Sequence, residues 1–307
     1  MCYNRELQKK MKKLWNKRTE LDFFKKTLKI TSPESLFYII DEEKYLAYWP
    51  KKYNGKKSTL QSRNAFIGTF TEKWVKDLLT PLAKELNAYA INKVVCEEIG
   101  LGIKSPADVA IVRTKEQNQK PENILLIIEV KMSLVWNWVY SPRSKKIKCV
   151  GDLTTHQGNP SLLRSDTMLK AIGKSLNIRV SGRESSKIPI IIIGNTPITK
   201  TYFKKVDFLK KAGIIQGFYS VNPLPFNNKS DNENKEKNIK KTQDEGFLRI
   251  DRVEELYASI SNLIREERNF FSSMVSKRKL GEIIDIASKE TTYERKAERF
   301  LTLLEEN

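Results

Sequence analysis

Three charged residues stand at the ends of two apolar runs of the sequence. Asp108 opens the run in "SPADVAIV", and Glu129 and Lys131 end the run in "ENILLIIEVK". Side chains alternate along an extended segment, so Glu129 and Lys131 project to one face and Val130 projects to the other. Asp108 precedes Glu129 by 21 positions, which leaves room for one hairpin. Adjacent antiparallel strands would therefore bring the two carboxylates together.

Such a pair of carboxylates indicates a cation site. Two neighbouring carboxylates repel each other and raise each other's proton affinity unless a cation lies between them. Mg²⁺ suits this place, because it prefers oxygen and is commonly held by one or two carboxylates plus phosphate oxygens of a substrate. An ammonium at Lys131 can position or deprotonate an attacking water and offset charge in the transition state. The three residues predict phosphodiester hydrolysis, and the alternative for Lys131 is a strand-end lysine that only neutralises Glu129.

The pattern P-x-D at 106–108, about twenty residues, an apolar strand and E-V-K at 129–131 resembles the PD-(D/E)XK nuclease superfamily. That group includes most type II restriction endonucleases and several repair nucleases. The resemblance spans residue 64 to about residue 195, a little under half the chain, and the residue between Pro106 and Asp108 makes the motif less specific. It implies a core of a helix, three antiparallel strands, a crossover helix and a further strand. It also implies that Asp108 and Glu129 bind Mg²⁺, that the Val130 carbonyl joins them and that Lys131 acts on the nucleophilic water.

Two further acids are candidates for the metal site. Glu72, in "GTFTEKWV", occupies the place where many of these nucleases carry a helical glutamate that reaches the metal through water. Its alternative is an ordinary solvated helix position. Glu98 ends the first predicted strand and is the weaker candidate, because a strand-end charge explains it as well.

The elements that must position these residues follow an α/β order. Residues 64–89 set large apolar side chains on one helical stripe that should face a sheet. Three strands, a helix, a strand, a second helix and another strand follow. The runs "ILLII" and "PIIIIG" do not alternate, which is typical of central strands covered on both faces. We therefore expect a mixed central β-sheet flanked by helices, a restriction-endonuclease-like core with added N- and C-terminal helices.

Composition divides the chain into four regions. We expect an N-terminal helical extension over 1–60, with a charged helix from about residue 3 to residue 30, and the nuclease core over 61–226. Residues 227–245 hold one apolar residue, Ile239, and read as a mobile charged insert. Residues 246–307 are expected to form a C-terminal, mainly helical region packed on the core, with a short edge strand at "GFLRID".

The chain is strongly basic, which points to a polyanionic partner. Its 307 residues carry 56 Lys and Arg against 37 Asp and Glu, a formal charge of +19. Such a positive field attracts nucleic acid and speeds its capture; the alternative is a surface made basic by codon bias. The resemblance implies double-stranded DNA, with Arg164 and Lys170 of the crossover helix as contacts. Lys145 and Lys146 in the preceding loop are further candidates for phosphate contacts.

Other residues of the loop before the crossover helix have two interpretations. Trp136, Trp138 and Tyr140 alternate, either as a strand with one aromatic face in the core or as base contacts. His156 is the only histidine, so neither a zinc site built from histidines nor a paired-histidine nuclease can be assembled. Gln157 serves either polar recognition or loop capping.

The leading hypothesis is a Mg²⁺-dependent type II restriction endonuclease acting as a homodimer, with a companion DNA methyltransferase encoded nearby. A repair or junction-resolving nuclease of the same superfamily is the first alternative. The second is a non-catalytic basic DNA-binding protein in which the three charged residues form only an ion-pair cluster. Cys2, Cys96 and Cys149 are an odd set at wide spacing, which with the absence of a leader or apolar span predicts a cytoplasmic protein.

Overall fold

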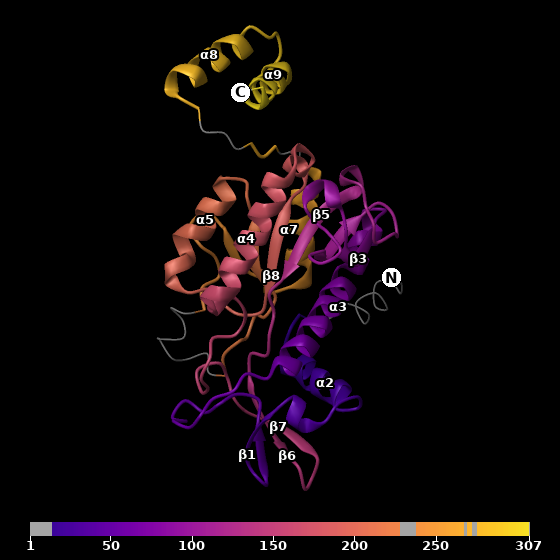
Figure 1. Cartoon of the computed structure of the whole chain (residues 1–307), viewed down its shortest axis with the longest axis vertical. Helices are drawn as coiled ribbons and strands as arrows, with labels where there is room; N and C mark the ends of the chain where they lie inside the picture. Colours follow the sequence, from indigo (N-terminus) through magenta and orange to yellow (C-terminus); the bar gives the residue numbers. More distant parts are fainter. Residues whose placement is uncertain (1–13, 228–237, 267–268, 272–274, 307) are drawn as a thin grey trace, which may run out of the picture. The chain divides into compact units, whose positions relative to one another are not determined.

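A six-stranded mixed sheet forms the centre of residues 14–266 in the computed structural model (Figure 1). The structure describes residues 14–227, 238–266, 269–271 and 275–306. The strand order is β10-β9-β8-β5-β4-β3, with β3, β4 and β5 antiparallel and β5, β8, β9 and β10 parallel. The strands are β3 (Tyr89–Val94), β4 (Ala107–Val112), β5 (Ile124–Val130), β8 (Ile190–Gly194), β9 (Gly217–Ser220) and β10 (Phe247–Arg249).

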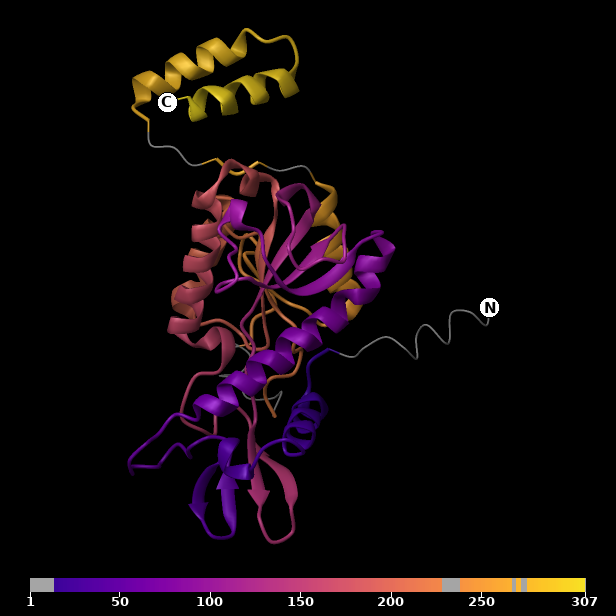
Figure 2. The same cartoon turned by 45° about the vertical axis from the view of Figure 1, so that its right-hand side comes forward.

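Helices cover both faces of this sheet, as Figure 2 shows. Leu126 and Ile128 of β5 share a core with helices α3 and α7, whereas Ile127 points the other way into a core with α4. Helix α5 packs beside α4 against β8 and β9. The predicted α/β class and the mixed sheet are thus confirmed. Helices lie on both sides because strands that are buried on both faces must be covered on both faces. The helices are α3 (Gln61–Glu85), α4 (Ser165–Ser181), α5 (Phe203–Lys211) and α7 (Val253–Arg265).

A second, four-stranded antiparallel sheet of order β1-β2-β6-β7 was not expected. The region 1–60 is therefore not purely helical: α2 occupies only part of it, and residues 1–13 lie outside the described chain. β1 and β2 have 4 and 3 residues, too short for a period-two pattern, and β6, the second partner of β2, comes far later in the chain. The elements are α2 (Lys17–Thr27), β1 (Tyr38–Asp41), β2 (Lys44–Leu46), β6 (Asn137–Ser141) and β7 (Lys146–Gly151).

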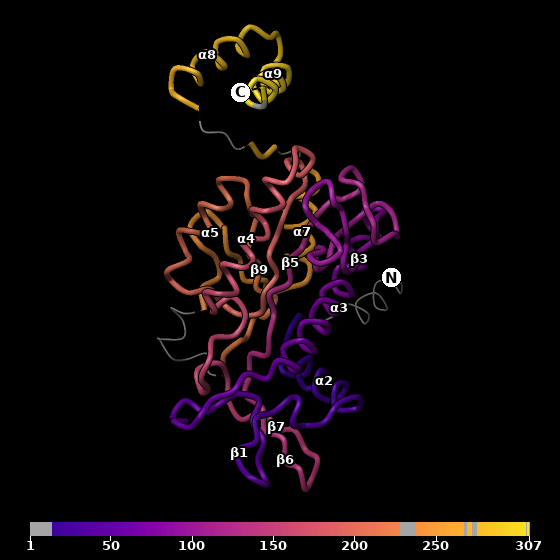
Figure 3. Tube along the Cα trace, in the orientation of Figure 1, coloured from indigo at the N-terminus to yellow at the C-terminus, as the bar shows by residue number. Residues whose placement is uncertain are grey.

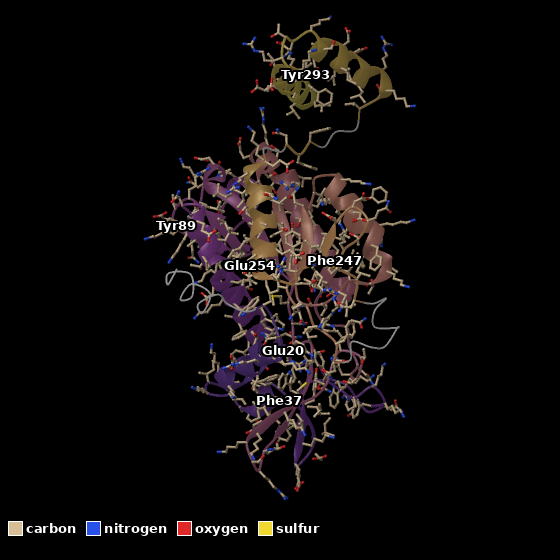
Figure 4. All side chains as sticks on the ribbon, turned by 180° about the vertical axis from the view of Figure 1, so that it is seen from behind. Glu20, Phe37, Tyr89, Phe247, Glu254 and Tyr293 are labelled. Carbon is tan, nitrogen blue, oxygen red and sulfur yellow. The ribbon has the colours of Figure 1, made fainter. Side chains whose placement is uncertain are left out.

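A buried carboxylate joins α2 to this second sheet. Glu20 is fully buried and accepts four hydrogen bonds, from the Val135 and Trp136 N–H groups and from the indole N–H groups of Trp15 and Trp138. Figure 4 labels Glu20 next to Phe37, whose ring stacks on Phe24 of α2 in the same aromatic core. The N-terminal region is thus fixed to the segment that follows β5.

Residues 227–245 lie partly outside the described chain. The described residues 238–245 pack against their neighbours rather than forming a free insert. The Thr242 hydroxyl donates to Asp207 of α5 at 2.5 Å, and Lys240 Nζ lies 2.6 Å from Glu255 Oε1 of α7. Mobility remains a prediction for the undescribed residues 228–237.

Residues 269–307 form a compact unit of their own, which differs from the expectation that 246–307 is one region packed on the core. β10 and α7 belong to the larger unit, whereas α8 (Lys277–Ser288) and α9 (Tyr293–Glu305) bury Ile283, Leu303 and Leu304 between them. The apolar residues of this helical hairpin cover one another, which accounts for the division.

The remaining short elements are 3₁₀ helices of three to five residues. No helix among the described residues is long and apolar enough to cross a membrane. The 3₁₀ helices are η1 (Pro33–Ser35), η2 (Glu97–Ile99), η3 (Pro121–Asn123), η4 (Ser161–Leu163), η5 (Arg183–Lys187) and η6 (Lys200–Tyr202).

Candidate active site

The β4–β5 pairing brings Asp108 and Glu129 together as predicted. Val109 pairs with Ile128 in antiparallel register, so the preceding and following residues, Asp108 and Glu129, stand opposite each other on one face. Asp108 Oδ2 accepts the Val130 N–H at 2.8 Å, which fixes its carboxylate to the end of β5. The Glu129 side chain is completely buried, whereas Asp108 keeps 18% of its side-chain surface exposed.

Two lysines surround this pair. Lys131 Nζ lies 3.2 Å from Asp108 Oδ2 and 3.0 Å from Glu129 Oε2. Lys174 Nζ, arriving from α4, lies 3.4 Å from Asp108 Oδ1 and 2.6 Å from Glu129 Oε1. Each carboxylate therefore offers one oxygen to each lysine. We call these four residues the charge cluster.

Burial and ion pairing set the protonation of the charge cluster. Burial and the neighbouring Asp108 raise the pKa of Glu129, against the opposing charges of the two lysines. Burial acts against the charged form of Asp108, but Lys131, Lys174 and the Val130 N–H hold its pKa below the ordinary value. Burial likewise opposes the charge of Lys131, yet the two carboxylates raise its pKa. Lys131 is therefore an ammonium in this cluster.

The position of Lys174, a basic residue of the crossover helix α4, among the carboxylates was not predicted. A helical signal for its position exists in the sequence. Met168, Ala171 and Ile178 are buried on the face of α4 that meets the sheet, and Lys174 follows Ala171 by three residues and precedes Ile178 by four. Positions with this spacing share one helix face, so the ammonium of Lys174 reaches the sheet edge instead of solvent.

A hydrogen-bond network holds the backbone where β5 ends. The Ser161 hydroxyl donates to the Lys131 carbonyl at 2.5 Å and accepts the Asn195 N–H at 3.1 Å. The Asn195 amide in turn bonds both backbone groups of Ser133. Ser161 has a φ of 50°, a left-handed conformation that costs free energy in a non-glycine residue. The loop before α4 is thus tied to the strand that carries Glu129 and Lys131.

Glu72 lies near the charge cluster. The Asn92 side-chain amide donates to the carbonyls of both Glu72 and Asp108, at 3.1 Å each, and so links α3 to β4. Burial and the charge of Asp108 raise the pKa of Glu72, whereas Lys93 and the two cluster lysines oppose the shift. This electrostatic interaction supports the prediction that Glu72 lies near Asp108. Binding of a metal by Glu72 through a water stays a prediction.

Glu98 does not end a strand as expected. It lies in the turn η2 and is exposed, whereas Cys96 is buried. β3 ends at Val94, before this acid, so Glu98 does not share the face of the sheet edge that carries Asp108. The metal role of the Val130 carbonyl stays a prediction, since the contact given for Val130 at the site is made by its N–H.

Arg164 and Lys170, the predicted DNA contacts, stand at the start of α4 and are exposed. Arg164 Nη2 and Lys170 Nζ lie 3.5 and 3.1 Å from Asp166 Oδ2, so one carboxylate offsets part of their charge. Both residues precede Lys174, which is carried by the same helix. Their role in binding DNA remains a prediction.

Lys145 and Lys146 lie on the β6–β7 hairpin of the second sheet, away from the strands that carry the charge cluster. Both are exposed. With Lys25 of α2 and Lys148 of β7 they line an open groove. Figure 3 follows the chain from β5 down to this hairpin. The groove concentrates four lysines, a chemistry that suits phosphate groups.

The alternating aromatic residues after β5 belong to the hydrophobic core. Trp136, Trp138 and Tyr140 are 1%, 3% and 7% exposed, so the alternative prediction, that they contact DNA bases, is wrong for all three. His156 is buried, and its ring stacks on Tyr48 with centroids 3.9 Å apart. Gln157 donates to two carbonyls of the loop after β2, which confirms loop capping.

The charge cluster fits a hard divalent cation. Glu129 Oε1 is buried, and the Lys174 ammonium, 2.6 Å away, is its ion-pair partner. Two adjacent carboxylates are an arrangement that Mg²⁺ can use when the cations beside them give way. In the described part of the chain, no three His, Cys, Asp or Glu side chains gather as metal ligands. The protein would thus supply two carboxylates, Asp108 and Glu129.

Comparison with known proteins gives no match to the chain among family models, curated proteins or solved structures.

Proposed function

We propose that this protein is a Mg²⁺-dependent endonuclease that hydrolyses double-stranded DNA at specific sites, as type II restriction enzymes do. The observation that supports it most is the pairing of Asp108 with Glu129 at the end of β5, with two lysines within ion-pair distance. The order α3, β3, β4, β5, α4, β8, with β8 parallel to β5, agrees with the PD-(D/E)XK core.

Three residues of the charge cluster, together with Glu72, would have a role in this reaction. Asp108 and Glu129 would hold the cation, and Glu72 would hold a water beside it. Mg²⁺ supplies, when bound, a Lewis acid for the phosphate and a lower pKa for the attacking water. Lys131 orients that water and stabilises the negative charge that develops on the phosphate oxygens, since its raised pKa keeps it positive.

Specific cleavage requires contacts beyond the charge cluster. Arg164 and Lys170 on α4 and the lysine-lined groove of Lys145 and Lys146 would bind phosphates on either side of the scissile bond. A homodimer would present two such sites to the two strands of a near-palindromic sequence. A companion methyltransferase would protect the host DNA by modifying that sequence.

The decisive experiment incubates the purified protein with unmethylated phage DNA, in Mg²⁺ and in EDTA, at several salt concentrations. Discrete fragments with Mg²⁺ alone are expected from site-specific cleavage, and a smear would indicate a nonspecific or repair nuclease. Glu129→Gln and Lys131→Ala should abolish cleavage while the far-UV spectrum stays unchanged. Lys187→Ala, which removes an exposed lysine from η5, is the matched control and should cut like the parent.

A second candidate function is supported by the same charge cluster. Its two carboxylates and two lysines balance each other, so the ion pairs satisfy the buried charges without any metal. A basic DNA-binding protein without catalysis would have the same fold and the same salt-dependent affinity. DNA retarded on a gel but left intact with Mg²⁺, on substrates covering all short recognition sequences, would favour this function over the nuclease.

A further inference from the structure

Lys174 stands where the two carboxylates converge. Its ammonium contacts Asp108 Oδ1 and Glu129 Oε1, and also lies 2.6 Å from the Pro106 carbonyl oxygen. An ammonium that bridges two carboxylates and a backbone carbonyl has the oxygen neighbours that a metal cation would take at this place.

We propose that Lys174 is an internal cation that competes with the divalent metal for Asp108 and Glu129. The proposal rests on the proposed function and deepens it. In the protein without DNA, the ammonium neutralises the two carboxylates. When a DNA phosphate arrives, Lys174 moves to that phosphate and leaves the carboxylates to the metal. Bound DNA therefore raises the affinity for metal, and bound metal raises the affinity for DNA. The protein without DNA binds metal weakly.

Charge balance gives the first reason. Two carboxylates and two ammonium groups sum to zero, so a divalent cation added to the cluster would introduce two uncompensated positive charges among partly buried groups. Two changes relieve this repulsion: one ammonium withdraws, or an anion enters. A DNA phosphate that attracts Lys174 brings about both changes at once.

The proposed reaction identifies Lys174, not Lys131, as the lysine that gives way, because Lys131 is the group that orients the attacking water. Lys174 Nζ lies 2.6 Å from Glu129 Oε1 and 3.4 Å from Asp108 Oδ1, so it occupies one oxygen of each carboxylate. Once the ammonium leaves, these two oxygens are available to a metal. The Lys174 side chain is 20% exposed, close to the 19% of Lys131, so it is not sealed from solvent.

The test measures Mn²⁺ binding to the full-length protein in the absence of DNA, by electron paramagnetic resonance of the free ion at fixed pH. Lys174→Met should bind Mn²⁺ about tenfold more tightly or better than the parent, because one repelling charge has left the carboxylates. Lys187→Met makes the same change in net charge at an exposed position and should alter the affinity by less than about twofold. Lys174→Gln serves if the Met variant does not fold.

Equal Mn²⁺ affinity in the parent and in folded Lys174→Met would overturn the proposal. Adding Glu129→Gln to Lys174→Met should remove the gain, and a gain that survives would place the ion elsewhere and also overturn it. A parent that binds Mn²⁺ tightly and cuts DNA would leave the nuclease function intact while rejecting the competition. Failure of both variants and of the parent to bind Mn²⁺, with or without DNA, would remove the metal site itself, and the nuclease function with it.

Discussion

At the scale of single residues, the charge cluster is a small set of mutually dependent ionisations. Glu129 is fully buried and has a raised pKa, whereas Asp108, bonded to the Val130 N–H, has a lowered one. Perturbed pKa values of this kind cluster at functional sites and also occur in structural ion-pair networks. The lysines lower the pKa of both acids, but in Glu129 burial and the charge of Asp108 outweigh them.

Removing both partners of an ion pair in the charge cluster should cost less than the sum of removing each partner alone. We expect Glu129→Gln and Lys131→Met each to lower the free energy of unfolding by about 1 to 3 kcal/mol, because each leaves charges unpaired. The double variant should lose clearly less than the sum, with a coupling of about 1 to 2 kcal/mol. Urea unfolding of all four proteins completes the cycle. Additive losses would mean that the ion pair contributes nothing.

Glu20 should make stability depend on pH. Burial raises its pKa to about 7, although four N–H donors oppose the shift. Folding therefore favours the protonated carboxyl, and the protein loses this contribution as the pH rises from the unfolded pKa of 4.5 through about 7. Between pH 5 and pH 8 the stability of Glu20→Gln relative to the parent should rise by roughly 2 to 3 kcal/mol. Urea unfolding measures this difference. If the difference in stability between Glu20→Gln and the parent were the same at both pH values, this pKa would be contradicted.

At the scale of elements, the site is built where several elements meet at the ends of strands. β4 and β5 supply Asp108, Glu129 and Lys131, and α4 supplies Lys174. The loop before α4 holds β5 through Ser161. The chain then continues from β5 into the second sheet, where Glu20 fixes α2. A change at this anchor should therefore affect the stability of the whole N-terminal region.

Loss of the Glu20 carboxylate should be among the most destabilising single changes in the chain. Glu20→Ala leaves two backbone and two indole N–H groups buried without an acceptor, so we expect a loss of about 3 to 5 kcal/mol. Thermal and urea unfolding measure it. Asp22→Ala, an exposed position of the same helix α2, should change stability by less than about 0.5 kcal/mol. If both variants lost a similar amount of stability, the hydrogen bonds of the Glu20 carboxylate would not be needed for folding.

At the scale of the whole molecule, positive charge and division into two units are the main features. The formal charge of the chain is +19. The charge cluster itself contributes nothing to it, because its four charges cancel. The positive field must then come from other basic residues, such as the exposed lysines of the β6–β7 hairpin.

The lysine-lined groove should contribute to the salt dependence of DNA binding. Replacing Lys145 and Lys146 by alanine should lower the slope of log affinity against log salt by about 1 to 2, because up to two phosphate contacts are lost. Fluorescence anisotropy with a random duplex in EDTA measures the slope without cleavage. Lys187→Ala with Lys204→Ala, both exposed on other elements, is the control. An unchanged slope in the hairpin variant would exclude this groove from the DNA path.

The larger unit should fold without the C-terminal helical hairpin. Each unit has its own buried core, and Ile283, Leu303 and Leu304 lie in the core of the smaller one. A chain ending at residue 268 should therefore unfold cooperatively within about 3 °C of the corresponding transition of the full chain. A much lower midpoint would mean that the hairpin stabilises the larger unit.

The sequence by itself determined the mixed sheet, the order of its elements and the meeting of Asp108 with Glu129, because apolar runs and hairpin spacing are local signals. For Gln157 and for the alternating aromatic residues the sequence left two alternatives each. Hydrogen bonds decided for Gln157 and burial decided for the aromatic residues. Tertiary structure alone decided what depends on elements far apart in the chain. It placed Lys174 of α4 among the carboxylates, paired the short strand β2 with β6, and aimed four N–H donors at Glu20. A residue's own neighbours in sequence carry no record of such partners, since long-range contacts form only when the chain has folded.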